Sequence, residues 1–108
     1  MPLNLEDTWI KAAIEHVILE IGYHSETKNE TTIRTIEPDF IGYTSKKYTL
    51  CYYAIFCHLR HEGPKCFQPG RIFRYRPTGE HFEPSPLGRW TELQSEYDRK
   101  GLAQISFN

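Results

Sequence analysis

The most constraining feature of this sequence is residues 48–59, YTLCYYAIFCHL, in which apolar side chains occupy odd and even positions alike. Successive side chains of a β-strand point to opposite faces of its sheet, so both faces of this segment would be apolar. Such a strand needs cover on both faces. The segment therefore predicts a central strand of a sheet domain. One face would carry Tyr48, Leu50, Tyr52, Ala54 and Phe56, and the other Cys51, Tyr53, Ile55, Cys57 and Leu59.

The chain before this strand predicts a helix followed by a hairpin. Residues 4–16 place apolar side chains at helical spacing, and Asn4 is the expected N-cap. From Val17 the apolar period changes to two, which is typical of a strand. After the polar turn SETKNE, residues 31–36 predict a second strand. Glu37-Pro38 would end its ladder, because proline has no amide hydrogen to donate.

The chain after the central strand predicts two more strands and a second helix. A strand would start at Lys65, and residues 71–76 alternate again before an expected turn at 77–80. Residues 89–100 have helical spacing, and residues 102–107 could add an edge strand. The predicted fold class is mainly β (α+β). It is a small, partly open β-barrel of about five antiparallel strands with an N-terminal and a C-terminal helix.

The length and composition predict a single domain. The 108 residues form one unit over 1–108, since two cores would not fit comfortably. No apolar run approaches the length of a membrane span, and the start MPLNLEDTWIK lacks the features of a signal peptide. We therefore expect a cytoplasmic protein with no membrane partner. Three cysteines are an odd number, which favours reduced thiols in a reducing compartment.

The formal net charge of -1 hides an uneven distribution of charged residues. Residues 1–41 carry a net charge of -5, residues 42–76 carry +6, and residues 77–108 carry -2. A basic middle in a nearly neutral chain indicates a local anionic partner, because charges act mainly within a Debye length. The alternative is a solvated basic face that is balanced by acidic residues across the fold.

Five short motifs in the middle of the chain occur in the order seen in WYL domains. Glu37-Pro38 matches the Glu-Pro pair after the second strand of that family. Tyr48-Thr49-Leu50 lies where the Trp-Tyr-Leu tripeptide is expected, and keeps only its leucine. Lys65-Cys66-Phe67 matches Arg-x-Phe with lysine for arginine, and Gly70-Arg71-Ile72 matches Asp-Arg-Ile without the acid. Thr78-Gly79-Glu80-His81-Phe82 matches the last motif in full.

The resemblance covers roughly residues 13–83 and implies a stand-alone, divergent WYL domain. WYL domains are Sm-like small β-barrels, best known as the sensor part of bacterial transcription regulators. The resemblance implies a non-enzymatic module that binds a nucleotide or single-stranded nucleic acid on a basic face, in transcriptional regulation or defence signalling. A second copy of the chain is a further candidate partner. The residues that match the binding face are Tyr48, Arg60, Lys65 and Arg71.

The stretch GRIFRYRP, residues 70–77, extends this basic and aromatic set. Arginine binds phosphate with two donors, and aromatic rings stack on bases. In a regular strand, Arg71 would share a face with Phe73 and Tyr75, while Arg74 and Arg76 would share the other with Ile72. Two arginines beside a core isoleucine would be costly to bury. We therefore expect the strand to bend beyond Ile72, with Arg74 and Arg76 near an open end and Arg71 beside Arg60 and Lys65 in an anion site.

The same residues also admit other interpretations. Tyr53, Phe67 and Ile72 could simply be core, and the arginines could pair with acids of residues 1–41. The barrel edge or the apolar side of the first helix could dock another protein. A zinc site could draw on Cys57, His58, His61 and Cys66, and a Cys–His nucleophile pair on Cys66 with His61 or His81. The spacing favours neither of the last two, so no metal, cofactor or enzymatic activity is expected.

Overall fold

The N-terminal helix forms as its sequence predicts. In the computed structural model, which describes residues 3–59, 61 and 63–107, α1 spans Leu5–Glu15. The Asn4 side chain accepts a hydrogen bond from the Asp7 amide at 2.8 Å, so it caps the first turn. The helix ends at His16 in the left-handed conformation, directly before the first strand. None of the helices that the structure describes is both long and apolar enough to cross a membrane.

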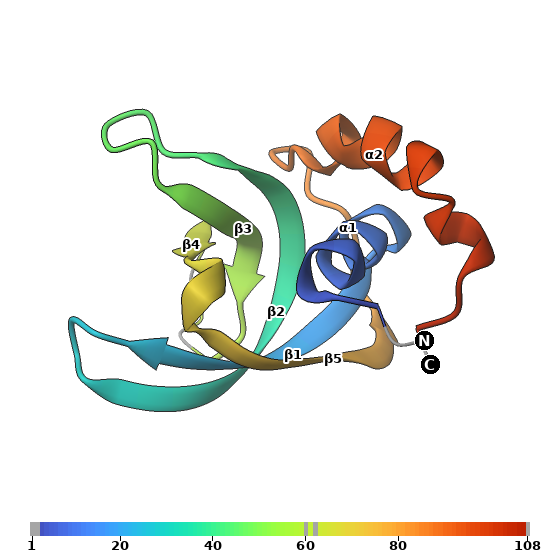
Figure 1. Cartoon of the computed structure of the whole chain (residues 1–108). Coiled ribbons are helices and arrows are strands. Elements are labelled where there is room, and N and C mark those ends of the chain that lie inside the picture. Colours follow the sequence, from blue (N-terminus) through green and yellow to red (C-terminus); the bar gives the residue numbers. More distant parts are fainter. Residues whose placement is uncertain (1–2, 60, 62, 108) are drawn as a thin grey trace.

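Five antiparallel strands form one open, strongly curved sheet, which confirms the predicted fold class (Figure 1). The strand order is β4-β3-β2-β1-β5, so β4 and β5 are the two edges. The segment predicted to be apolar on both faces is flanked by β2 and β4. Its predicted alternation is wrong at the end, because Tyr52 and Ala54 lie in the core together with Cys57, which the alternation places on the opposite face. The strands are β1 (Val17–Ser25), β2 (Glu30–Tyr43), β3 (Leu50–Cys57), β4 (Lys65–Phe67) and β5 (Ile72–His81).

The expectation that Glu37-Pro38 ends a strand is wrong. Strand β2 continues through this pair to Tyr43, and Pro38 lies opposite Ala54 of β3. The pairing register shifts between Glu37 and Pro38 and again between Pro38 and Ile41. The first shift leaves Ile55 of β3 as the extra residue, and the second leaves one extra residue in β2. A missing amide donor is tolerated at such bulges, and bulges bend the strands. The proline therefore marks where β2 curves.

The core lies between the inner face of the sheet and α1. Trp9 of α1 is fully buried; its ring packs edge-on against Tyr52, and its indole N–H donates to the Asp39 carbonyl at 3.3 Å. These contacts tie the helix to two neighbouring strands at the place where β2 bends. The buried residues of this cluster are Trp9, Ala12, Val17, Leu19, Ile21, Tyr23, Ile36, Tyr52, Ala54, Cys57, Phe67 and Ile72.

The C-terminal segment covers the other side of α1 and forms no strand. It contains the short helices η2 (Trp90–Leu93), α2 (Gln94–Arg99) and η3 (Leu102–Gln104). The predicted helix over 89–100 is therefore present as a 3₁₀ turn and an α turn, whereas the edge strand predicted over 102–107 is wrong. Leu93 and Leu102 pack on Ile10 and Ala13, so the segment lies against α1 and not along an edge of the sheet.

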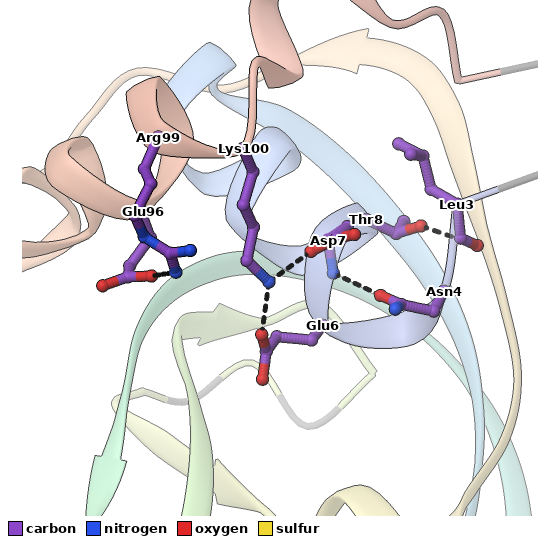
Figure 2. A network of polar contacts seen from close by, with 8 residues as sticks. All are labelled: Leu3, Asn4, Glu6, Asp7, Thr8, Glu96, Arg99 and Lys100. Carbon is purple, nitrogen blue, oxygen red and sulfur yellow. Dashed lines mark hydrogen bonds and ion pairs between the residues drawn. The ribbon is translucent and has the colours of Figure 1, made fainter.

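Polar contacts reinforce the packing of the C-terminal segment on α1 (Figure 2). Lys100 Nζ lies 2.6 Å from Glu6 Oε1 and 2.7 Å from Asp7 Oδ1, in the first turn of α1. Hydrogen bonds to these two carboxylates raise the pKa of Lys100. Both acids lie at the N-terminus of α1, where the helix dipole stabilises negative charge. Lys100 therefore pairs with two carboxylates that are already favourable at this place.

The expectation of three reduced thiols is wrong. Cys51 of β3 and Cys66 of β4 form a disulfide, with their Cα atoms 5.5 Å apart. Neighbouring strands bring the two residues within bridging distance, which the odd number of cysteines did not reveal. Cys57 is the free cysteine, and it is fully buried in the core.

Candidate functional site

A bulge in β5 rearranges the faces of the GRIFRYRP stretch. Ile72 pairs with Tyr23 and Arg74 pairs with Gly22, so Phe73 is an extra residue between two consecutive positions of β1. Ile72 and Tyr75 consequently lie on the same, core-facing side. The predicted alternation, which placed them on opposite faces, is therefore wrong. The missing Cβ of Gly22 leaves room for the displaced Phe73 ring, whose atoms come within 2.6 Å of where a Cβ would be.

Arg74 and Arg76 share a face, as predicted, but this is the outer face of the sheet and not the face of the core residue Ile72. Their Nη2 atoms lie 3.9 Å and 3.1 Å from the two oxygens of Glu20 on β1. Because they pair with Gly22 and Glu20 in the middle of β1, they do not lie at the expected open end. Both arginine side chains are more than half exposed, so the outer face gives them water and avoids the cost of burial.

Arg71 lies outside the strand, in the 3₁₀ turn η1 (Pro69–Arg71) that connects the two edge strands. Its Nη2 is 2.7 Å from Glu26 Oε2, in the turn between β1 and β2. Its Nε donates to Gln68 Oε1 at 2.8 Å. The hydrogen bond and charge of Arg71 lower the pKa of Glu26, and the same bond raises that of Arg71. Glu26 is 72% exposed, so this pair is open to solvent and to competing anions.

The structure does not gather the whole predicted set. Tyr48 is 81% exposed in the loop between β2 and β3, and Figure 1 shows that loop on the opposite side of the sheet from the β1–β2 turn that holds Glu26. Lys65 lies on β4, two residues from Phe67 and on the same face. Arg60 lies outside the described residues. Arg71 is thus separated from Tyr48. Of the predicted binding residues, Lys65 shares its strand face with Phe67.

A residue that the sequence reasoning missed is linked to Arg71 through Tyr23 and Gln68. Arg34 of β2 pairs with the buried Ile21, so its side chain points to the inner face of the sheet, and it is only 4% exposed. Its guanidinium carbon lies 5.5 Å from the ring centres of both Tyr23 and Phe67. Arg34 shares its strand face with Ile36, and this parity is the signal that could have identified it.

The charge of Arg34 is incompletely compensated. Its Nε donates to Thr32 Oγ1 at 2.8 Å, while its buried Nη1 has no hydrogen-bond partner among the described residues. Among the described residues, no carboxylate forms an ion pair with the Arg34 guanidinium. Contact with two aromatic faces is favourable for a cation, but it does not replace a hydrogen bond. A buried donor of this kind is suited to receive an anionic oxygen.

Arg34 and Arg71 belong to one connected group at this end of the sheet. The Tyr23 hydroxyl, whose ring faces Arg34, accepts a hydrogen bond from the Gln68 amide at 3.2 Å, and Gln68 in turn holds Arg71. We call this group the Arg34–Arg71 site. Its members come from three separate parts of the chain, and they are Tyr23, Arg34, Phe67, Gln68 and Arg71.

The cysteine and histidine alternatives meet specific obstacles. Cys66 is joined to Cys51, so it offers neither a thiolate ligand nor a nucleophile in this state. Cys57 is buried in the core, and His58 Nε2 lies 3.1 Å from Glu37 Oε2. Within the described part of the chain, no three His, Cys, Asp or Glu side chains are grouped so that they could hold a metal ion.

Comparison with solved structures finds a similarity to proteasome accessory factor B/C (PafBC) of Arthrobacter aurescens, with a TM-score of 0.56 and 22% sequence identity. The match covers 83% of this chain and 15% of the PafBC chain, so this chain spans a small part of that protein's length. Comparisons of the sequence with protein-family models and with curated proteins find no match. PafBC contains a WYL domain. The fold of this chain is therefore WYL-like, as the resemblance of its motifs predicts.

Proposed function

We propose that this chain is a non-enzymatic sensing module that binds a phosphate group of a nucleotide or of single-stranded nucleic acid at the Arg34–Arg71 site, in a regulatory role. The observation that carries the proposal is the buried Nη1 of Arg34, a charged donor without a partner among the described residues. Burial of a cation without a carboxylate costs several kcal/mol, on the order expected for a desolvated charge. A phosphate oxygen would recover that cost in the bound state.

Arg71 provides the entrance to this site. Its carboxylate partner Glu26 is largely exposed, and such surface pairs are weak, so a phosphate can replace Glu26 at little cost. The η1 turn that carries Arg71 also contacts Tyr23 through Gln68. Exchange of Glu26 for a phosphate would move this turn and open a path to Arg34. The aromatic faces of Tyr23 and Phe67 stand beside the bound group.

The salt dependence of the binding affinity distinguishes this function from a protein-docking role. If phosphates are bound, a plot of the logarithm of the association constant against the logarithm of the salt concentration should have a negative slope. For single-stranded nucleic acid, this slope is about −0.7 for each phosphate that the protein neutralises. An apolar interface lacks this dependence. Titration of a labelled oligothymidine and of ATP into the full chain at several salt concentrations measures it.

Replacement of Arg34 by methionine is the direct test of the site. The variant Arg34→Met should lose at least about tenfold in affinity for oligothymidine or ATP, because a charge-assisted hydrogen bond is removed. Its melting temperature should stay the same or rise, since apolar replacements of buried charges are often neutral or stabilising. Arg99→Met, which changes an exposed arginine paired with Glu96, is the matched control and should bind normally. Unchanged binding by Arg34→Met, or a large loss of stability, would show that Arg34 is structural.

A further inference from the structure

A groove on the outer face of β2 and β3 lies away from the Arg34–Arg71 site. Tyr52 and Ala54 of β3 face the core, so Tyr53 between them faces outward. Two hollows meet there at Ile55, one of about 290 Å³ and one of about 330 Å³, and residues 85–89 border both. We call this feature the Ile55 groove. The side chains that define it are Glu37, Phe40, Tyr53, Ile55, Leu87 and Arg89.

The irregular pairing of β2 and β3 creates the groove. Both register shifts of this pair lie between Glu37 and Ile41, and bulges of this kind often accompany binding sites. Asp39 at the bulge is 6% exposed, and its two carboxylate oxygens accept the Arg89 amide at 3.0 Å and 2.9 Å. This anchor holds the segment beside the strands, so the groove is formed before any ligand arrives.

The larger apolar surface lies at the Arg89 end. The rings of Phe40 and Tyr53 are nearly parallel, with centres 6.3 Å apart, and the Arg89 guanidinium lies 3.9 Å from the Phe40 ring centre. Leu87 at the rim is 83% exposed, which leaves a large apolar side chain in water. An aromatic side chain seated here would cover Leu87 and contact both rings.

The polar groups at this end are already engaged with one another. Arg89 donates to both carboxylate oxygens of Glu92 at 2.7 Å and 3.1 Å, and Asp39 is occupied by the Arg89 amide. A nucleobase has several polar edge atoms, and most of them would lose water here without a replacement. A hydrocarbon ring has no polar atoms that would lose water, and an indole N–H could donate to the Tyr53 hydroxyl instead. The chemistry therefore favours an aromatic side chain over a base.

The other end of the groove is acidic. The Glu37 carboxylate lines the second hollow beside Ile55 and Phe56, and its side chain is 19% exposed. Its Oε2 lies 3.1 Å from His58 Nε2, so a basic side chain of a partner would share this carboxylate with His58. A partly buried carboxylate attracts a cation and repels a phosphate. The groove thus combines an aromatic seat at one end with a carboxylate at the other.

We propose that the Ile55 groove docks an extended segment of a partner protein, with an aromatic side chain against Phe40, Tyr53 and Leu87 and a lysine or arginine beside Glu37. Buried aromatic anchors with a charged neighbour are common where peptides bind grooves. This function goes beyond anion sensing, because it uses a different face and the opposite charge. It would let the domain contact a second protein while the Arg34–Arg71 site remains available.

Nuclear magnetic resonance titrations of the full chain test the aromatic seat first. N-acetyltryptophanamide should shift the resonances of Tyr53, Ile55 and Leu87 in a saturable manner. Leu87→Ser should weaken this binding about fivefold, because apolar contact area is lost. The control Ile33→Ala changes an exposed apolar residue at the other end of β2, and it should leave binding unchanged. Absence of shifts in the groove would overturn the proposal.

Peptides test the acidic end. Acetylated tryptophan joined to an arginine amide through one to three alanines should bind about threefold more tightly than its glutamate counterparts, as expected for one partly exposed ion pair. Glu37→Gln should abolish this difference while the groove still binds N-acetyltryptophanamide. Equal binding of the arginine and glutamate peptides would overturn the assignment of the partner. Saturation of the groove resonances by an oligothymidine instead would identify it as a nucleic-acid site.

Discussion

The exposed partner of Arg71 has a consequence for ligand affinity. Glu26 competes with any phosphate that approaches Arg71, and its carboxylate is held ionised by that arginine, which lowers its pKa. The variant Glu26→Gln should therefore bind oligothymidine or ATP several-fold more tightly, since a competing surface ion pair is removed. Glu80→Gln, at another exposed acid, is the control for net charge. Weaker binding by Glu26→Gln would mean that Glu26 positions Arg71 for the ligand.

Two tyrosines should resist ionisation and destabilise the fold at high pH. Burial raises the pKa of Tyr52 to about 12, and burial together with the hydrogen bond to Glu15 raises that of Tyr97 to about 12. The folded chain thus retains protons that the unfolded chain releases near the ordinary value of 10.0. Stability should be constant below that pH and fall above it.

Phenolate absorbance and urea unfolding at increasing pH measure these effects. The double variant Tyr52→Phe/Tyr97→Phe should show a flatter decline in stability above pH about 10, because two shifted groups are removed. Titration of all seven tyrosines of the chain in one step near that pH would contradict the expectation.

Among the elements, β4 depends most on a covalent link. It has three residues and pairs only with β3, yet it carries Phe67, which is fully buried beside Arg34. The disulfide between Cys51 and Cys66 closes a loop with a sequence separation of 15. A loop of that size contributes about 3 kcal/mol to the free energy of unfolding in the chain-entropy account.

The variant Cys51→Ser/Cys66→Ser should consequently lose about 3 kcal/mol of stability in urea unfolding. Wild-type protein treated with a dithiol reductant should match it. Under oxidising conditions, a thiol assay on the unfolded wild type should detect one free thiol, that of Cys57. Three free thiols in protein purified without reductant would show that the link does not form.

The edge strand β5 has features that protect it from pairing with other chains. A bulge at Phe73, Pro77 within the strand and the exposed charges of Arg74 and Arg76 each disfavour the addition of another strand. Part of the local arginine content is therefore explained by the needs of the sheet. Arg71 and Arg34 have no such role, because neither lies on this outer surface.

The molecule as a whole consists of a curved sheet, a helix against its inner face and a C-terminal segment that covers the helix (Figure 1). Leu102 is 1% exposed where that segment contacts Ile10 and Ala13. Its carbonyl also accepts a hydrogen bond from the buried Lys11 Nζ at 2.9 Å. The segment is thus part of the folded unit and not an appended tail.

Leu102→Ala should reduce the free energy of unfolding by about 3 kcal/mol, because a buried leucine is replaced by a cavity. Leu87→Ala, at an exposed leucine, is the control and should cost less than about 0.5 kcal/mol. Urea unfolding monitored by tryptophan fluorescence measures both. Equal small losses would show that the C-terminal segment is not docked in solution.

Local sequence patterns determined most of the elements of this protein. The capped helix, the strands and the curved antiparallel fold follow from apolar periodicity and from motif order, because each depends mainly on neighbouring residues. Irregularities escaped this reasoning. The bulges at Pro38 and Phe73 shift strand faces, and they arise only when a strand is paired with its neighbour.

The composition of the candidate sites was decided by the tertiary structure. Charge and aromatic content indicated a basic region and identified Arg71, but they also included Tyr48, which lies far from it. Arg34 and its aromatic neighbours meet only through strand pairing across the sheet, and the Cys51–Cys66 link depends on the same geometry. A sequence reports which side chains are present and which face each one takes in a regular strand. Which residues from distant strands come within a few ångströms depends on register and curvature, and these are properties of the packed sheet.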